Sequence, residues 1–137
     1  MWKWWALLSA VFAALTALLA KLGVKDVDSN VATAVRTCVV LLIATGVVAA
    51  TGNLGSFASL TRWNWLFLTL SGAATGLSWL FYFKAIQLGD ISKVGPVDKL
   101  SVAFVILFGI LFLHEPAEPK TLIGAALILA GSVAILL

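Results

Sequence analysis

Charged side chains are scarce in this sequence: only 11% of its 137 residues are Asp, Glu, Lys or Arg. A soluble domain typically has about a quarter of its residues charged and about half apolar, whereas 62% of this chain is hydrophobic. Water is therefore a poor solvent for it. A bilayer core about 30 Å thick needs roughly 20 apolar residues for each helical crossing, so the length allows five crossings and leaves no room for a soluble domain.

Groups that carry catalysis or bind metals are also few. Cys38 is the single cysteine and His114 the single histidine, so neither an internal disulfide nor a zinc site is expected. Glu115 and Glu118 lie in a proline-containing loop, and the chain has no glycine-rich phosphate loop. The nine basic residues are scattered, which argues against nucleic-acid binding. We expect neither an enzyme nor a bound cofactor or metal ion.

Five long apolar runs, separated by short polar turns, divide the chain. Backbone groups in hydrocarbon must be paired inside their own segment, and the runs lack strand-like alternation, so they favour helices. We predict an all-α membrane protein, one domain over residues 1–137, with transmembrane helices at about 4–22, 31–50, 63–87, 95–113 and 120–137. Gly95 and Pro96 are expected to open the fourth helix, where a missing amide donor does little harm. We expect the first helix to be retained rather than cleaved as a signal peptide.

Basic residues in the turns do not decide how the chain sits in the membrane. Arg36, Lys84 and Lys99 fall within apolar runs, and when they are set aside three basic residues remain on each side. The positive-inside rule then favours neither orientation. Two opposed copies would form an inverted repeat like that of many transporters. One fixed orientation, with a parallel dimer or a partner chain, is equally compatible with the charges.

Four charged residues lie at bilayer depth: Arg36, Lys84, Asp98 and Lys99. A charge in a membrane span costs several kcal/mol unless it reaches the interface or finds a partner. One interpretation is a polar binding site for an anionic or zwitterionic solute, in which Asp98 partly neutralises the three cations. The other is that Lys21, Lys84 and Lys99 extend to lipid head groups and Asp98 forms an ion pair.

Hydroxyl side chains form a stripe along the third predicted helix. Ser71, Thr75, Ser78 and Tyr82 follow one another at spacings of four, three and four residues, and Trp79 borders them. This spacing places the four on one side of a helix. Such a stripe faces either another helix or a solute path, because lipid offers polar groups nothing. Tyr82 and Trp79 are the better ligand candidates, being large and near the charged end.

Small residues recur along the last predicted helix: Gly124, Ala126, Ala130, Gly131 and Ala134. A face of small side chains lets two helix backbones approach closely, which is how helices associate inside lipid. We expect this face to form a dimer interface, and the alternative is a contact within the chain.

Several of these residues stand in motifs that resemble the EamA domain of the drug/metabolite transporter superfamily. In the carboxy-terminal half the motifs are Lys84-Ala85, Gly95-Pro96-Val97-Asp98, Glu115 after the fourth apolar run, and Gly124 to Gly131. The first half agrees through its Trp-rich first helix, Lys21 and Arg36. The resemblance covers the whole chain.

The resemblance implies a fold and a function. Members of that superfamily usually have ten helices made of two inverted EamA copies, and they export metabolites, amino acids, drugs and related small solutes. This chain resembles one copy, which implies an EamA-like half-repeat completed as a homodimer, parallel or antiparallel. It implies an exporter of a small solute in the cytoplasmic membrane of a bacterium or archaeon. The alternative is a non-transporting membrane subunit or scaffold that assembles through its small-residue helix faces.

The last helix is also similar to the dimerising helix of small multidrug resistance transporters, through the glycine spacing in GAALILAG. Those exporters use a glutamate in their first helix for proton and cation coupling. The first helix here has no acidic residue. Proton-driven export of cationic drugs is therefore not expected.

Overall fold

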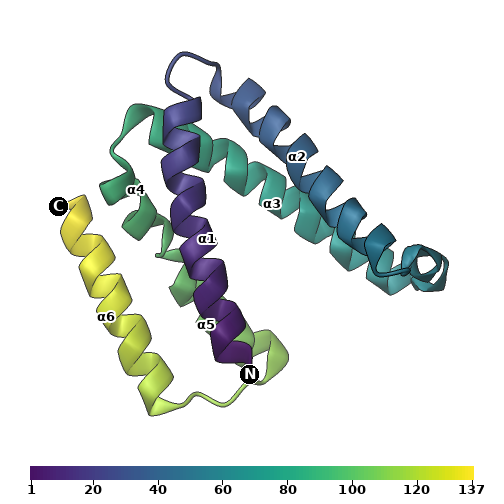
Figure 1. The fold of residues 1–137 in the computed structure, drawn as a ribbon. Coiled ribbons are helices and arrows are strands. Elements are labelled where there is room, and N and C mark those ends of the chain that lie inside the picture. The colour runs from purple at the N-terminus through teal and green to yellow at the C-terminus, as the bar shows by residue number, and fades with distance from the viewer. The chain divides into compact units, whose positions relative to one another are not determined.

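The computed structural model describes residues 1–137 and contains helices but no strands (Figure 1). The elements are α1 (Trp2–Gly23), α2 (Ser29–Ala50), the 3₁₀ helix η1 (Leu54–Ser59), α3 (Arg62–Leu88), α4 (Ile91–Asp98), α5 (Ser101–Leu113) and α6 (Pro119–Leu136). Five spans are long and apolar enough to cross a membrane: α1, α2, α3, α4 together with α5, and α6. The prediction of an all-helical membrane protein with five spans is confirmed.

Short polar side chains begin two of the helices. Asp28 caps α2, because its Oδ1 accepts hydrogen bonds from the N–H of Asn30 at 2.9 Å and of Val31 at 3.2 Å. Before α3, the Thr61 N–H donates to Asn64 Oδ1 at 3.0 Å, and the Asn64 N–H donates to Thr61 Oγ1 at 3.2 Å. These bonds satisfy amides that a helix start leaves without an internal partner. The polar turns thus set where the apolar helices begin.

The fourth span is two helices rather than one. It begins at Ile91, four residues before the predicted start, so Pro96 lies inside α4. Proline has no N–H to donate to the carbonyl four residues earlier, and its ring crowds that carbonyl. Just after it, the N–H groups of Lys99 and Leu100 donate to carbonyls three residues back, at 3.0 Å each. This tighter 3₁₀ pattern interrupts the α-helix and separates α4 from α5.

The chain forms two compact units, each of which is described by itself: the first unit is Met1–Ala17 with Leu88–Leu137, and the second is Leu18–Gln87. In the first unit α4 and α5 both pack against α6. Ser132 of α6 is 3% exposed, and its Oγ donates to the Pro96 carbonyl of α4 at 2.7 Å. A polar contact between helices therefore holds the interrupted span against α6.

The core of the second unit lies where the end of α1, the following turn, the start of α2 and the end of α3 meet. Its buried side chains are Val24, Ser29, Thr33, Phe83 and Ile86. Lys21 Nζ donates to the Ile86 carbonyl at 2.6 Å. Gln87 Nε2 donates to the carbonyls of Val24 at 3.2 Å and Val27 at 2.8 Å. Helix ends leave such carbonyls without internal partners, so these bonds hold the start of α2 beside the end of α3.

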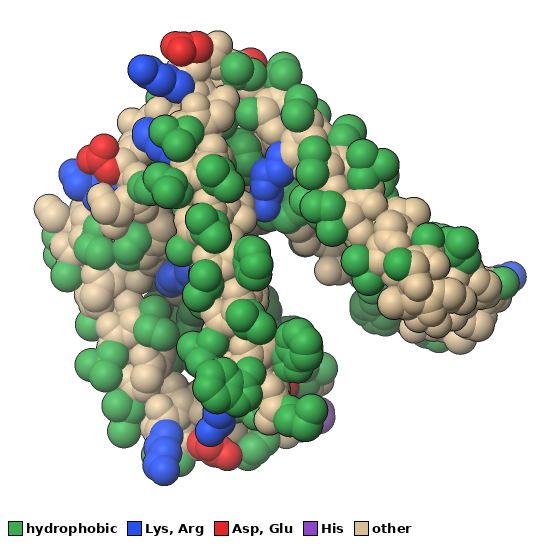
Figure 2. All heavy atoms as spheres, in the orientation of Figure 1, with side chains coloured by type: hydrophobic (Ala, Val, Ile, Leu, Met, Phe, Trp, Pro, Cys, Tyr) green, Lys and Arg blue, Asp and Glu red, His purple; other side chains and the backbone are tan.

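Most large apolar side chains lie on the outside of the helices, as Figure 2 shows for the visible face. Four hydrophobic side chains are buried within the single chain: Val24, Phe83, Ile86 and Ala125. Monomeric soluble proteins rarely expose so large a contiguous apolar surface. The outer surface therefore matches lipid or another membrane-embedded chain rather than water.

Candidate solute-binding site

Arg36 of α2 lies against aromatic side chains of α3. Its Cζ is 4.0 Å from the centre of the Trp79 ring and 5.4 Å from that of Phe83. The two rings are four residues apart, so they share one face of α3. A cation over an aromatic ring is attracted to the negative face of the π system, by about 0.5–1 kcal/mol at exposed sites and about 2 kcal/mol when desolvated. Arg36 therefore turns toward the neighbouring helix.

The packing of α2 explains this direction. Thr33 stands three residues before Arg36 and is 5% exposed, so Arg36 shares the side of α2 that packs into the core of the second unit. The Thr33 hydroxyl donates to the Ser29 carbonyl at 2.8 Å, and the Thr37 hydroxyl donates to the Thr33 carbonyl at 2.7 Å. The hydroxyls of this turn are thus satisfied within α2, and Arg36 is the group that reaches across to α3.

No carboxylate of the second unit lies within a span. Its two acidic residues, Asp26 and Asp28, stand in the turn before α2, and Asp28 already caps that helix. Both ion pairs of the structure lie in the first unit. Tyr82 interacts electrostatically with Arg36, but a neutral phenol cannot balance a full positive charge. Arg36 is thus a cation inside a span whose charge is not neutralised by an acidic side chain of its unit.

The predicted hydroxyl stripe runs beside the aromatic face of α3. Ser78 and Tyr82 directly precede Trp79 and Phe83, so they project about 100° away around the helix. Three members of the stripe, Ser71, Thr75 and Ser78, are exposed, and Tyr82 is half-buried and interacts electrostatically with Arg36. The Thr75 hydroxyl donates to the Ser71 carbonyl at 2.9 Å. The structure thus places Trp79 against Arg36, gives Tyr82 an electrostatic interaction with it, and leaves the smaller hydroxyls exposed.

At Arg36 the structure places Phe83 rather than the predicted Lys84. Lys84 follows Phe83 directly, so it leaves α3 about 100° further around the helix, and it is exposed. The structure does not bring it to Arg36. Phe83 was not among the predicted site residues, yet it is 2% exposed and contacts the guanidinium. Its spacing of four residues from Trp79 is the sequence signal that could have found it.

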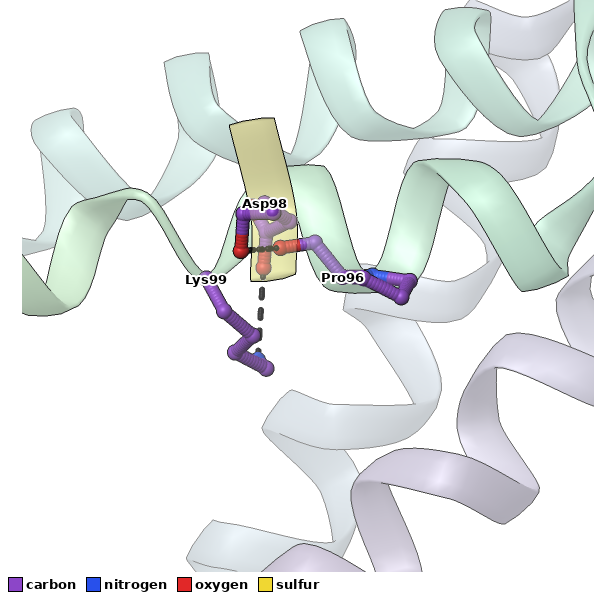
Figure 3. Close-up of polar contacts among 4 residues, drawn as sticks. Pro96, Asp98 and Lys99 are labelled. Carbon is purple, nitrogen blue, oxygen red and sulfur yellow. Dashed lines mark hydrogen bonds and ion pairs between the residues drawn. The ribbon is translucent and has the colours of Figure 1, made fainter. Parts of the chain in front are cut away.

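Asp98 and Lys99 form an ion pair at the joint between α4 and α5, in the first unit. Asp98 Oδ2 and Lys99 Nζ are 3.4 Å apart, and Figure 3 shows the two side chains beside Pro96. The side chains are 41% and 57% exposed, respectively. Such a pair contributes little to stability, because water screens it and its geometry is loose. The two charges therefore remain open to another partner.

The small residues of α6 lie away from its packed side. Ala125 and Ser132 are buried on the side that packs within the first unit. The predicted interface residues are Ala126, Ala130, Gly131 and Ala134, all exposed, and Gly124, which is half-buried. The face of small residues therefore stays exposed rather than buried in a contact within the chain.

Five apolar spans, one of them interrupted beside an ion pair and another carrying a cation, define a multi-pass membrane protein. The chain belongs to the EamA-like transporter family, whose model matches residues 1–137. The family resemblance predicted from the sequence is confirmed. Membership makes the chain a membrane transporter.

Two relatives agree with this assignment. The chain is 50% identical over 131 residues to the "Uncharacterized transporter in cobO 3'region" of a Sinorhizobium species, a match that covers 96% of this chain and 93% of the relative. It is 26% identical over 128 residues to the "Uncharacterized transporter YxxF" of Bacillus subtilis strain 168, covering 93% of this chain and 40% of that relative. No solved structure matches the chain.

Proposed function

We propose that the chain exports a small anionic or zwitterionic solute across the cytoplasmic membrane as a homodimer of five-helix units. The observation that carries the proposal is Arg36, a cation inside a span that lies over Trp79 and has no acidic partner. Ionisable residues within membrane spans are energetically costly, and they commonly mark solute or ion paths. A solute with a negative group would balance the charge of Arg36 each time it passes.

The proposed solute path follows α3 in the second unit. Arg36 attracts the negative group, while Trp79 and Tyr82 provide large surfaces with a polar edge beside it. The exposed hydroxyls of Ser71, Thr75 and Ser78 continue the path along the helix. Few polar contacts are available in such a site, so we expect micromolar to millimolar affinity, about −4 to −8 kcal/mol.

The interrupted fourth span, in the first unit, carries a second group of charged residues. Backbone that departs from the α-helix inside a membrane is tolerated where it is buried in protein or lines a water-filled cavity. Interrupted helices line the solute and ion sites of many transporters. Asp98 and Lys99 stand at the interruption with exposed side chains, so we propose that they bind solute at this point of the first unit. Lys84, exposed near the end of α3, would add positive potential at the mouth of the path.

A dimer is proposed because one five-helix unit leaves an apolar face of small residues open. The Bacillus relative is more than twice as long as the segment that this chain matches, since that segment covers 40% of it. A longer relative of this kind has room for two such units in one chain. Two copies of the present chain would reach the same size by pairing through the small residues of α6. Rocking of the two halves would then expose the solute alternately to each side.

A flux measurement tests the proposal. The purified chain is inserted into phosphatidylcholine liposomes loaded with a mixture of amino acids and organic acids, and their release is followed by mass spectrometry. We expect saturable release of a subset of the solutes. Arg36→Ala should lower that release at least about tenfold, because the contacts of a charged hydrogen-bonding group are lost. Arg62→Ala is the matched control, since Arg62 is exposed at the start of α3.

The same preparation separates this function from its alternatives. If the Arg36→Ala protein released solutes as fast as the unaltered chain, the proposed path would be wrong. Stoichiometric copurification of another membrane protein, with no release, would instead support a scaffold. In living cells, expression should lower the internal level of the transported solute. A higher internal level would show import rather than export.

A further inference from the structure

The surroundings of Arg36 also indicate which chemical group of the solute is recognised. We propose that the solute carries a carboxylate, and that Trp79 and Phe83 hold the Arg36 guanidinium so that its N–H edge binds both oxygens of that group. This inference rests on the proposed function, because it names the chemical class of the solute that the site would carry. Phe83 becomes a positioning residue in this scheme.

The argument begins with the shape of the guanidinium. It is planar, and its five N–H donors point outward in the plane. A ring whose centre lies 4.0 Å from Cζ, as that of Trp79 does, is close enough to cover one face of the group. A ring over a face leaves the donors at the edge uncovered. Aromatic contacts therefore orient the group without occupying its hydrogen-bonding capacity.

The donors of Arg36 are accessible. The Arg36 side chain makes no hydrogen bond or ion pair within the structure. Because no buried side-chain nitrogen lacks a partner, its N–H groups are not buried. Its edge is thus open to an acceptor from outside the chain. Partial burial beside two aromatic rings lowers the local dielectric constant, which strengthens a charge-assisted hydrogen bond relative to water.

The charge of the site favours a carboxylate over a phosphate monoester. A phosphate monoester carries about −1.5 to −2 charges at neutral pH, and it would need a second cation near Arg36. Two other cations of the second unit are otherwise placed, since Lys21 Nζ donates to the Ile86 carbonyl and Lys84 is exposed on another side of α3. A carboxylate carries one negative charge, and the spacing of its two oxygens matches the guanidinium fork.

A phospholipid phosphodiester also carries one negative charge and could reach the same edge. Arg36 is the eighth residue of α2, so it stands about 10 Å along the helix axis from its start. A lipid head group would have to descend to that depth, or the side chain would have to extend outward to it. The aromatic contacts instead hold the guanidinium against α3, which favours a solute in the path.

Matched pairs of solutes test the carboxylate assignment. Liposomes containing the full chain are loaded with equal amounts of lactate and lactamide, and of benzoate and benzamide. Release is measured for each member, and binding is measured by thermal shift in phosphatidylcholine nanodiscs. At least one carboxylate should be released and bound about tenfold better than its amide, because the amide has no charge and only one acceptor oxygen.

Three variants assign that preference to the site. Arg36→Lys keeps the charge but loses the planar fork, so the ratio of carboxylate to amide should fall about tenfold toward one. Phe83→Leu should lower the ratio a few-fold by releasing the orientation of the guanidinium, with the maximal rate less affected than the half-saturating concentration. Phe81→Leu is its control, since Phe81 is 73% exposed, and it should leave the ratio unchanged.

The outcomes separate this inference from the proposed function. Release of acids and amides at equal rates would keep the transporter and overturn the carboxylate assignment. A carboxylate that binds through Arg36 but is never released would keep the assignment and overturn transport. Phospholipid that copurifies only when Arg36 is present, and that no carboxylate displaces, would show a lipid phosphate at the site and refute the inference. If the chain showed no preference for carboxylates and released no solute, both the carboxylate assignment and the proposed transport would be wrong.

Discussion

Removing the Ser132 hydroxyl should loosen the contact between α6 and the interrupted fourth span. In Ser132→Ala the hydrogen bond from Oγ to the Pro96 carbonyl is lost, and the site is 3% exposed, so water cannot readily replace it. The same carbonyl also accepts the Lys99 N–H at 3.0 Å. The carbonyl therefore keeps one partner after the substitution.

That remaining bond sets the size of the expected effect. A buried polar group left with no partner costs about 1–3 kcal/mol, whereas hydrogen bonds between side chains of membrane helices average about 0.6 kcal/mol and reach about 1.7 kcal/mol. We expect Ser132→Ala to lower the free energy of unfolding by about 1 kcal/mol. Ser132→Val should cost about 1–3 kcal/mol, because a larger branched side chain at a buried contact pushes α6 away.

Unfolding in mixed micelles measures this change. The purified chain is titrated with sodium dodecyl sulfate, and the loss of helix is followed by circular dichroism. Ser92→Ala is the control, since Ser92 is exposed on α4. If Ser132→Ala were as stable as Ser92→Ala, the bond to Pro96 would contribute nothing. A loss above about 3 kcal/mol would mean that the carbonyl does not keep its second partner.

Two further substitutions test a helix end and the proposed interface. His114 ends α5 with φ at 54°, in the left-handed region, a conformation that costs a residue with a Cβ roughly 1–2 kcal/mol relative to glycine. His114→Gly should therefore raise the free energy of unfolding by about 0.5–1 kcal/mol. A decrease would show that the imidazole itself stabilises the helix end. In a Cys38→Ser background, Ala130→Cys should crosslink two copies under oxidation. Ala125→Cys should not, because Ala125 is 9% exposed within the chain. The reverse result would move the interface to another face of α6.

The number of spans could be read from the sequence, because it depends on local composition alone. Apolar runs of about twenty residues match the thickness of a bilayer wherever they occur in a fold. The polar turns between them contain the capping residues that begin α2 and α3, such as Asp28 and Asn64. Each of these signals acts over a few residues, so no knowledge of the tertiary contacts was needed.

The fourth span shows where local signals became ambiguous. Gly95 and Pro96 fit a helix start, and their position before an apolar run predicts one there. In the structure the helix begins at Ile91 and tolerates Pro96 inside α4. The buried Ser132 of α6 binds the Pro96 carbonyl, and a contact of this kind between distant residues stabilises the interrupted helix. A proline motif alone does not reveal whether such a partner exists.

The candidate site shows the same division. The sequence placed Arg36 and Trp79 in different spans and marked both as candidates, because charged and polar groups are costly in lipid. Which cation meets which aromatic ring was decided by the packing of α2 on α3. That packing joined Arg36 to Trp79 and Phe83 and left Lys84 outside. Residues separated by more than forty positions meet only if each helix is rotated about its axis so that the two faces touch, and composition does not encode that rotation.

The sequence by itself determined that this protein is embedded in lipid rather than dissolved in water. It also determined the helical class, the five spans and the family. These follow from hydrophobic length, turn chemistry and short motifs, all of which are local. The tertiary structure alone decided the two halves of the fourth span, the orientation of Arg36 and the side of α6 that stays open. Each of these depends on side chains of different helices competing for the same contacts, and the free energy of that competition is not a property of any single segment.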